Sequence, residues 1–301
     1  MLRCALAFAA ASLALTAPAR ADLSVFACEP EWGALATEIG GDKVSVYTAM
    51  TGAQDPHRIQ ARPSLIAKAR AADIAICTGA ELEIAWMPMI AQQSANPKLQ
   101  QGADGMFEAA SFVRLADVPV KFDRSQGDIH SQENPHVQTD PRNILTIAKP
   151  LADRFARLDA ANAAAYQANY SDFAKRWTAA LARWNTEAAS LRGTPIVVSH
   201  ASWIYMEQWL GLKRVVALEP KPGVPPSSGY LAEVLAKLQA TPAKMVIRSA
   251  YEDDRPSAFI SERTGMPSVL LPFTVGGTPE ATDLFSLYDD TIKRMKTALQ
   301  K

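Results

Sequence analysis

The stretch Asp159–Leu191, DAANAAAYQANYSDFAKRWTAALARWNTEAASL, predicts one long helix with Asp159 as its N-cap. Its apolar positions recur in steps of three and four, the spacing of one helix face. They are Tyr166, Tyr170, Phe173, Trp177, Leu181, Trp184, Ala188 and Leu191. At ~1.5 Å per residue this helix would be about 50 Å long, more than the width of one small lobe. We therefore expect a linking helix over 159–192 that carries two lobes, with its aromatic side chains in the core.

Both flanks of this helix alternate between short apolar runs and segments with helical spacing, which is typical of parallel strands with covering helices. The predicted strands are Leu23–Ala27, Val44–Tyr47, Ile74–Cys77, Pro195–Val198, Val215–Leu218, Lys244–Ile247 and Ser268–Leu271. The fold class is therefore α/β, with two similar β/α lobes whose sheets are rich in parallel strands. We expect the lobes to occupy residues 22–158 and 193–301.

The N-terminal 21 residues have the features of a cleaved signal peptide. Arg3 precedes an apolar run over 5–15, and Ala19-Arg20-Ala21 fits a signal-peptidase site. The run is shorter than the ~20 residues of a bilayer span, so we expect an exported periplasmic protein without membrane insertion. The remaining chain has 29 basic and 31 acidic residues, a balance that gives no reason to expect a nucleic-acid partner.

Two cysteines, Cys28 and Cys77, remain after the predicted cleavage. Each lies at the end of a predicted strand, and the first and third strands are neighbours in many sheets of this class. Because exported proteins keep disulfides, we expect Cys28 and Cys77 to be bridged, with two buried free thiols as the alternative.

Three of the four histidines lie in short segments at predicted strand or loop ends: Asp55-Pro56-His57, Asn134-Pro135-His136 and Ser199-His200. Neutral imidazole is the commonest protein ligand for zinc and similar cations. Ligands also gather at the carboxyl ends of parallel strands. The three histidines therefore indicate a dispersed transition-metal site, whereas any one of them alone would more often be a hydrogen-bonded loop or core residue.

The chain resembles the metal-receptor class of ABC-transporter substrate-binding proteins, which take up zinc and manganese in bacteria. The resemblance covers nearly the whole chain after residue 21 and includes the long helix. It is carried by these segments in order: Asp55-Pro56-His57, Pro63-Ser64, Ala72-Asp73, Asn134-Pro135-His136, Asp140-Pro141, His200 and Glu219-Pro220. It implies that His57, His136 and His200 are metal ligands and that a membrane permease is the partner of a monomeric receptor. It also implies little hinge opening, because a stiff helix joins the lobes.

The chain departs from this family where members usually carry a ligating carboxylate. Thr274 stands at that position, so the fourth ligand is open between His130, an acidic residue such as Glu252, and water. The histidine-rich loop of many zinc receptors is also absent, and His130 is the only histidine in the corresponding segment. His130 could therefore bind the metal, cover the site, or be solvated.

Three imidazoles favour zinc, because manganese prefers a larger share of carboxylate oxygen. We therefore expect zinc as the transported ligand, with manganese or another divalent cation as the alternative. A second alternative is a zinc hydrolase whose metal-bound water sits at the open position. We expect no enzyme, since the sequence shows no obvious general base beside the histidines. A third alternative is a surface adhesin, but no lipid-attachment cysteine lies at the cleavage site, which favours a freely diffusing periplasmic receptor.

Overall fold

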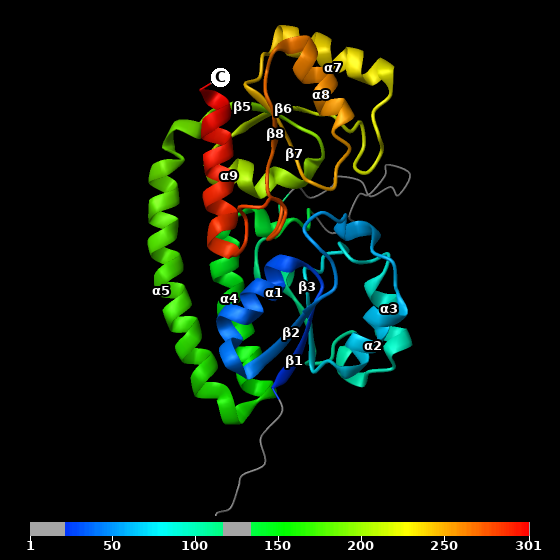
Figure 1. Cartoon of the computed structure of the whole chain (residues 1–301), viewed down its shortest axis with the longest axis vertical. Coiled ribbons are helices and arrows are strands. Elements are labelled where there is room, and N and C mark those ends of the chain that lie inside the picture. The colour runs from blue at the N-terminus through cyan, green and yellow to red at the C-terminus, as the bar shows by residue number, and fades with distance from the viewer. Residues whose placement is uncertain (1–21, 117–133, 301) are drawn as a thin grey trace, which may run out of the picture.

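The computed structural model describes residues 22–116 and 134–300 and shows two sheets, each surrounded by helices (Figure 1). The predicted signal peptide and His130 lie outside the described residues. In the part that is described, no helix combines the length and apolar character needed to cross a membrane.

The two sheets have the same strand order and contain parallel strands. The first sheet has the order β2-β1-β3-β4 and the second the order β6-β5-β7-β8. Their strands are β1 (Leu23–Ala27), β2 (Val44–Thr48), β3 (Ile74–Cys77), β4 (Met106–Glu108), β5 (Pro195–Val198), β6 (Lys213–Ala217), β7 (Met245–Arg248) and β8 (Ser268–Leu270). The predicted α/β class with two similar sheets is confirmed. The short edge strand β4 was not predicted, because three residues are too few to show a period.

The helices cover both faces of each sheet (Figure 1). They are α1 (Pro30–Gly40), α2 (Pro63–Ala71), α3 (Met87–Ser94), α4 (Pro141–Leu158), α5 (Ala163–Glu187), α6 (Ile204–Leu210), α7 (Ser228–Ala240), α8 (Arg255–Thr264) and α9 (Leu284–Leu299). Helices α2 and α3 cover one face of the first sheet, and α7 and α8 cover one face of the second. The remaining faces turn towards α1, α4, α5, α6 and α9.

One hydrophobic core extends across both sheets. Alternation along β3 sends Ile74 and Ile76 into this core and Ala75 and Cys77 to the opposite face, as the period of a strand requires. The same core includes Trp177 of α5 and residues of β5 and β7. The predicted aromatic face of the long helix therefore packs in the core.

The predicted helix over 159–192 is too long at both ends. The α-helix is α5, 25 residues, flanked by 3-10 turns at Ala160–Asn162 and Ala189–Leu191. Asp159 does not cap α5, because its carboxylate accepts bonds from Asn162 Nδ2 at 2.7 Å and Tyr166 Oη at 2.9 Å. At ~1.5 Å per residue α5 is about 37 Å long, which still extends alongside both sheets (Figure 1).

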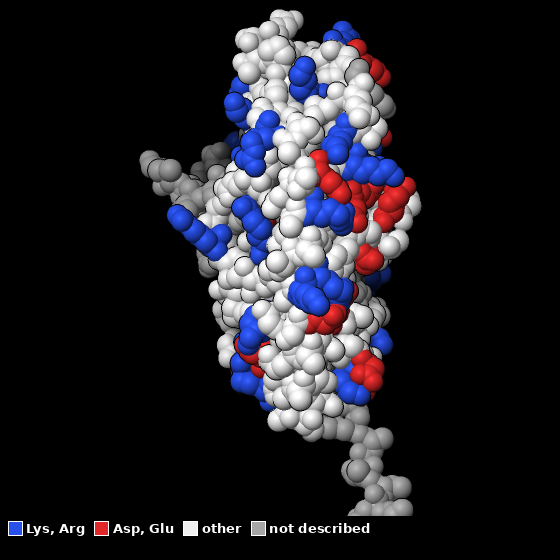
Figure 2. All heavy atoms as spheres, turned by 90° about the vertical axis from the view of Figure 1, so that its left-hand side faces the viewer, with Lys and Arg blue, Asp and Glu red and all other residues white. Residues whose placement is uncertain are grey.

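Charges of both signs are mixed on the face that carries α5 (Figure 2). Arg176 of α5 pairs with Glu38 of α1 at 2.5 Å, and Arg183 pairs with Asp289 of α9 at 2.7 Å. Exposed pairs of this kind contribute only about 0–1 kcal/mol each. The attachment of α5 to both halves of the molecule therefore rests mainly on its buried aromatic face.

The segments after β2 and β8 meet at very short range. A methyl group on Gly52 would lie 2.4 Å from the backbone carbon of Gly276 and 2.5 Å from the nitrogen of Gly277. Nearby, the Thr274 hydroxyl donates to the buried Glu31 carboxylate of α1. Backbone packs against backbone here, so no flexible side chain can move aside.

We predict that Gly52→Ala destabilises the protein by about 1–3 kcal/mol, because the added carbon overlaps backbone atoms. Urea denaturation of the metal-free protein measures this change. Gly229→Ala is the matched control, since a methyl group there meets only the Ser227 hydroxyl at 3.8 Å. Equal stability of the two variants would show that the contact yields easily.

Cys28 and Cys77 form a disulfide, which confirms the predicted bridge. Cys28 directly follows β1 and Cys77 ends β3, and these two strands are parallel neighbours.

We predict that a colorimetric titration of the denatured, unreduced chain from Asp22 onwards detects no free thiol, because both cysteines are in the disulfide. Two titratable thiols would contradict the bridge.

Candidate metal site

Three buried histidines converge where the two sheets face each other. Nitrogen atoms of His57, His136 and His200 lie within 4.8 Å of one another, and at most 8% of each residue is exposed. The ring centroids are 5.4, 5.6 and 5.8 Å apart. Three imidazoles around one tetrahedral cation stand at a similar separation of roughly 5 Å. The rings are thus already arranged as a set of cation ligands.

Each histidine comes from a different turn at the end of a strand or the start of a helix. His57 lies in a 3-10 turn, Pro56–Arg58, on the connection that follows β2. His136 directly precedes a 3-10 turn that leads into α4, and His200 is the second residue after β5. Two of the three histidines therefore lie beyond the carboxyl ends of parallel strands, and His136 comes from the turn before α4.

Every ring is oriented by a hydrogen bond at Nδ1. The acceptors are Asp55 Oδ1 at 2.8 Å for His57, Asn134 Oδ1 at 2.8 Å for His136, and Glu219 Oε2 at 2.6 Å for His200. An oxygen acceptor holds the proton on Nδ1, which places the lone pair on Nε2. This tautomer presents Nε2 for coordination in all three rings.

The same local hydrogen-bond arrangement occurs in two tripeptides, Asp55-Pro56-His57 and Asn134-Pro135-His136. In both, a side-chain oxygen accepts the histidine backbone N–H as well as its ring Nδ1, with backbone distances of 3.0 and 3.1 Å. The proline in the middle of each tripeptide has a fixed backbone angle φ, which restricts the conformation of the turn. Trp86 Nε1 also donates to the Pro56 carbonyl at 2.8 Å. The orientation of these two rings is therefore encoded within three residues each.

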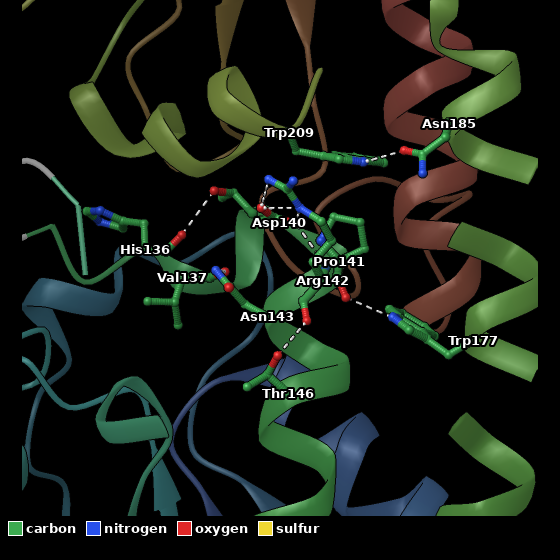
Figure 3. A network of polar contacts seen from close by, with 11 residues as sticks. His136, Val137, Asp140, Pro141, Arg142, Asn143, Thr146, Trp177, Asn185 and Trp209 are labelled. Atoms are coloured by element: carbon green, nitrogen blue, oxygen red, sulfur yellow. Dashed lines mark hydrogen bonds and ion pairs between the residues drawn. The ribbon is translucent and has the colours of Figure 1, made fainter. Parts of the chain in front are cut away.

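A polar network connects the His136 turn to α5 (Figure 3). Thr139 Oγ1 donates to the His136 carbonyl at 3.0 Å, and Asp140 caps α4 through the Arg142 N–H at 2.8 Å. Trp177 Nε1 of α5 then donates to the Pro141 carbonyl at 2.8 Å. The long helix thereby fixes the segment that carries a candidate ligand.

His200 is oriented by a residue far along the chain. Glu219 Oε2 accepts from His200 and also from the Gly223 N–H at 2.8 Å. One carboxylate therefore holds both the ring and the proline-rich loop Glu219–Pro226. Burial disfavours the imidazolium, but the hydrogen bond and charge of Glu219 outweigh it. The pKa of His200 is raised above its usual value.

Three acidic residues follow β7, Glu252, Asp253 and Asp254, and they differ in burial. Asp253 and Asp254 are exposed, whereas Oε1 of Glu252 is buried. Burial raises the pKa of Glu252 to about 7, although the neighbouring His200 acts to lower it. The sequence left Glu252 open as a candidate for the fourth ligand, and the structure buries one of its carboxylate oxygens in the turn after β7.

The structure brings together His57, His136 and His200, while His130 lies outside the described residues. Thr274 is buried and donates to Glu31, and thus lies at the contact between α1 and the segment after β8. The orienting roles of Asn134 and Glu219 were missed, although both residues stand in the segments that carried the resemblance. The repeated pattern of an acid or amide, then proline, then histidine was the available signal for the first.

The fold and the three-histidine site together define a cation-binding protein built on two parallel sheets. The model of a protein family described as zinc-uptake complex component A, periplasmic, matches residues 25–298. Because the match spans most of the chain, the chain belongs to this family, ZnuA.

Sequence relatives and solved structures agree with this family. The manganese ABC transporter substrate-binding lipoprotein PsaA of Streptococcus anginosus is 23% identical over 256 residues, 83% of this chain and 79% of that protein. A crystal structure of ZnuA has a TM-score of 0.78 at 20% identity and covers 92% of this chain and 99% of that one. FpvC from Pseudomonas aeruginosa, in complex with Mn²⁺, has a TM-score of 0.78 at 21% identity, with coverages of 92% and 98%.

We predict that Glu219→Gln weakens metal binding about 10- to 100-fold at neutral pH, the usual cost of losing an orienting partner. The variant should also shift the pH dependence. A proton on His200 competes with the cation, and a raised pKa lets this competition begin at a higher pH. Removing the Glu219 charge should therefore move the loss of affinity to lower pH. Competition titrations between pH 5 and 8 measure both effects, with the exposed Glu233→Gln as control.

Proposed function

We propose that this substrate-binding protein of a metal ABC transporter captures zinc between its two sheets and delivers it to a membrane permease. The observation that carries this proposal is the convergence of three buried imidazoles, each held by an Nδ1 hydrogen bond with Nε2 directed to a common point. The location of this site at the ends of strands from both sheets suits capture and release.

Zinc is favoured by the donor set. Three neutral nitrogens form a borderline-soft site, whereas manganese prefers more carboxylate oxygen. The similar proteins differ in the ions their names mention: PsaA names manganese, FpvC was solved with Mn²⁺, and a ZnuA deletion mutant was solved with zinc. The comparisons therefore support a divalent metal, and the choice of zinc rests on the ligands of this chain.

Release should need only a small rearrangement. The two halves are joined by direct hydrogen bonds near the site, including Asn134 Nδ2 to the Ala201 carbonyl at 2.9 Å and Tyr205 Oη to the Asn134 carbonyl at 2.5 Å. We infer lobes at residues 22–158 and 193–301 that rotate slightly about the linking segment 159–192. The protein would act as a periplasmic monomer after loss of residues 1–21.

We predict that alanine at His57, His136 or His200 weakens zinc binding by more than about 100-fold, beyond the cost of an outer-sphere change. Competition against a chromophoric chelator measures the loss, and adding Mn²⁺, Cu²⁺ and Ni²⁺ ranks the cargoes. Thermal melting of the metal-free variants checks the fold. Unchanged affinity in any variant would exclude that histidine as a ligand.

His130→Ala belongs in the same series of variants. A loss of affinity would indicate that His130 is a ligand, and faster metal dissociation alone would indicate that it covers the site.

A zinc-dependent hydrolase is the second candidate, and one observation favours it. Glu252 follows the strand next to the one that carries His200, and burial raises the pKa of its carboxyl group to about 7, the range of a general base. The zinc-loaded protein can be tested for ester hydrolysis and for carbon dioxide hydration. Turnover that Glu252→Gln abolishes would support the enzyme, whereas a rate no higher than that of free zinc would exclude it.

A further inference from the structure

The turn after β7 lies next to the strand end that carries His200. Strands β5 and β7 are parallel neighbours with Val198 paired to Ile247. Beyond this pair the chains stay in contact, since the Ser199 N–H donates to the Ile247 carbonyl at 2.9 Å. His200 and Ser249 each lie two residues beyond this last pair. The Ser249 N–H in turn donates to Glu252 Oε2 at 2.6 Å. The Glu252 carboxyl group is thus anchored at the strand end adjacent to His200.

The second oxygen of this carboxyl group has no hydrogen-bond partner. Glu252 Oε1 is buried from solvent and accepts no bond. An uncompensated buried carboxylate oxygen is costly, and coordination of a cation is one of the few ways to satisfy it.

The other carboxylates near the site already serve the ring nitrogens. Asp55 Oδ1 accepts from His57, and Glu219 Oε2 accepts from His200 and Gly223. Glu31 also has a buried oxygen without a partner, but its other oxygen accepts from Thr274, and its charge acts on Glu29 and Tyr288. Of these four carboxylates, Glu252 is the one that combines a buried oxygen without a hydrogen bond with an anchor at the strand end next to the one that carries His200.

We propose that Glu252 supplies the fourth ligand of the captured cation through Oε1, beside the three imidazole nitrogens. This inference rests on the proposed metal-binding function. The Glu252 oxygens are not among the atoms that lie within 4.8 Å of one another. Coordination therefore requires the side chain to swing towards the ion as it enters. Capture would couple directly to the turn after β7.

The donor set predicts which ions gain from this ligand. Three nitrogens and one anionic oxygen form a harder site than three nitrogens alone, and carboxylate oxygen is the donor that manganese prefers. Loss of the carboxylate should therefore weaken Mn²⁺ binding more than Zn²⁺ binding. A purely structural role of Glu252 would weaken both ions equally.

The test compares Glu252→Gln with Glu31→Gln in the chain from Asp22 onwards, stripped of metal. Chelator competition gives the Zn²⁺ and Mn²⁺ affinities, and the visible spectrum of the Co²⁺-loaded protein reports the ligand set. We expect Glu252→Gln to lose more than about 100-fold in Zn²⁺ affinity, more in Mn²⁺ affinity, and to change the Co²⁺ spectrum. Glu31→Gln should stay within about threefold and keep the spectrum, because that carboxylate faces Thr274.

Two results would overturn the proposal. One is a Glu252→Gln affinity within about threefold of the parent, and the other is a loss of affinity with an unchanged Co²⁺ spectrum, which places Glu252 outside the coordination sphere. If Glu252→Gln melts early, Glu252→Asp keeps the charge but shortens the reach and should show the same losses. His200→Ala distinguishes failure of the Glu252 proposal from failure of the metal-binding proposal, because it removes a histidine ligand and leaves Glu252 in place. A parent protein that binds neither ion, with no effect of His200→Ala, would refute the metal-binding function itself.

Discussion

The shared core around α5 is the constraint on which the rest of the molecule depends. Side chains from β3, β5 and the aromatic face of α5 pack in one continuous cluster, so the two sheets are not independent bodies. Burial of large aromatic side chains contributes roughly 1.5–3 kcal/mol each, far more than the exposed ion pairs on the same helix. The site lies between the two sheets, so its geometry is only as stable as this packing. Trp177 shows the link most directly, since it packs in the core and also bonds the Pro141 carbonyl.

Patterns with a clear period were read correctly from the sequence. The apolar runs at Leu23–Ala27 and Pro195–Val198 became β1 and β5 with the predicted bounds, and the aromatic positions of α5 are buried except Tyr170, which is partly buried. The ends of α5 were misread because Asp159 resembles an N-cap in sequence. In the structure its carboxylate binds Tyr166, a contact one turn further along that no capping rule anticipates.

The site was predictable to the extent that its determinants are local. His57 and His136 each stand two residues after the side chain that orients them, so the sequence shows ligand and partner together. The partner of His200 lies 19 residues away, and the approach of Glu252 depends on the pairing of β5 with β7. Thr274 likewise looked like a lost ligand, whereas its contact with Glu31 spans 243 positions of the chain. Contacts of this kind arise from tertiary structure and leave no pattern in one sequence.

The three histidines differ in how firmly their rings are held, because two orienting hydrogen bonds are local in sequence and the third comes from a distant residue. Two rings are locked by their own tripeptides and keep their orientation as long as the backbone is intact. His200 is locked by Glu219, which also holds the partly exposed loop at Gly223, and Arg58 from the other half donates to the Gly223 carbonyl at 3.4 Å. A partner that pulls this loop outward withdraws the acceptor from one imidazole without disturbing the other two. Displacement of this one loop would therefore change the orientation of a single candidate ligand and leave the fold and the other two rings in place.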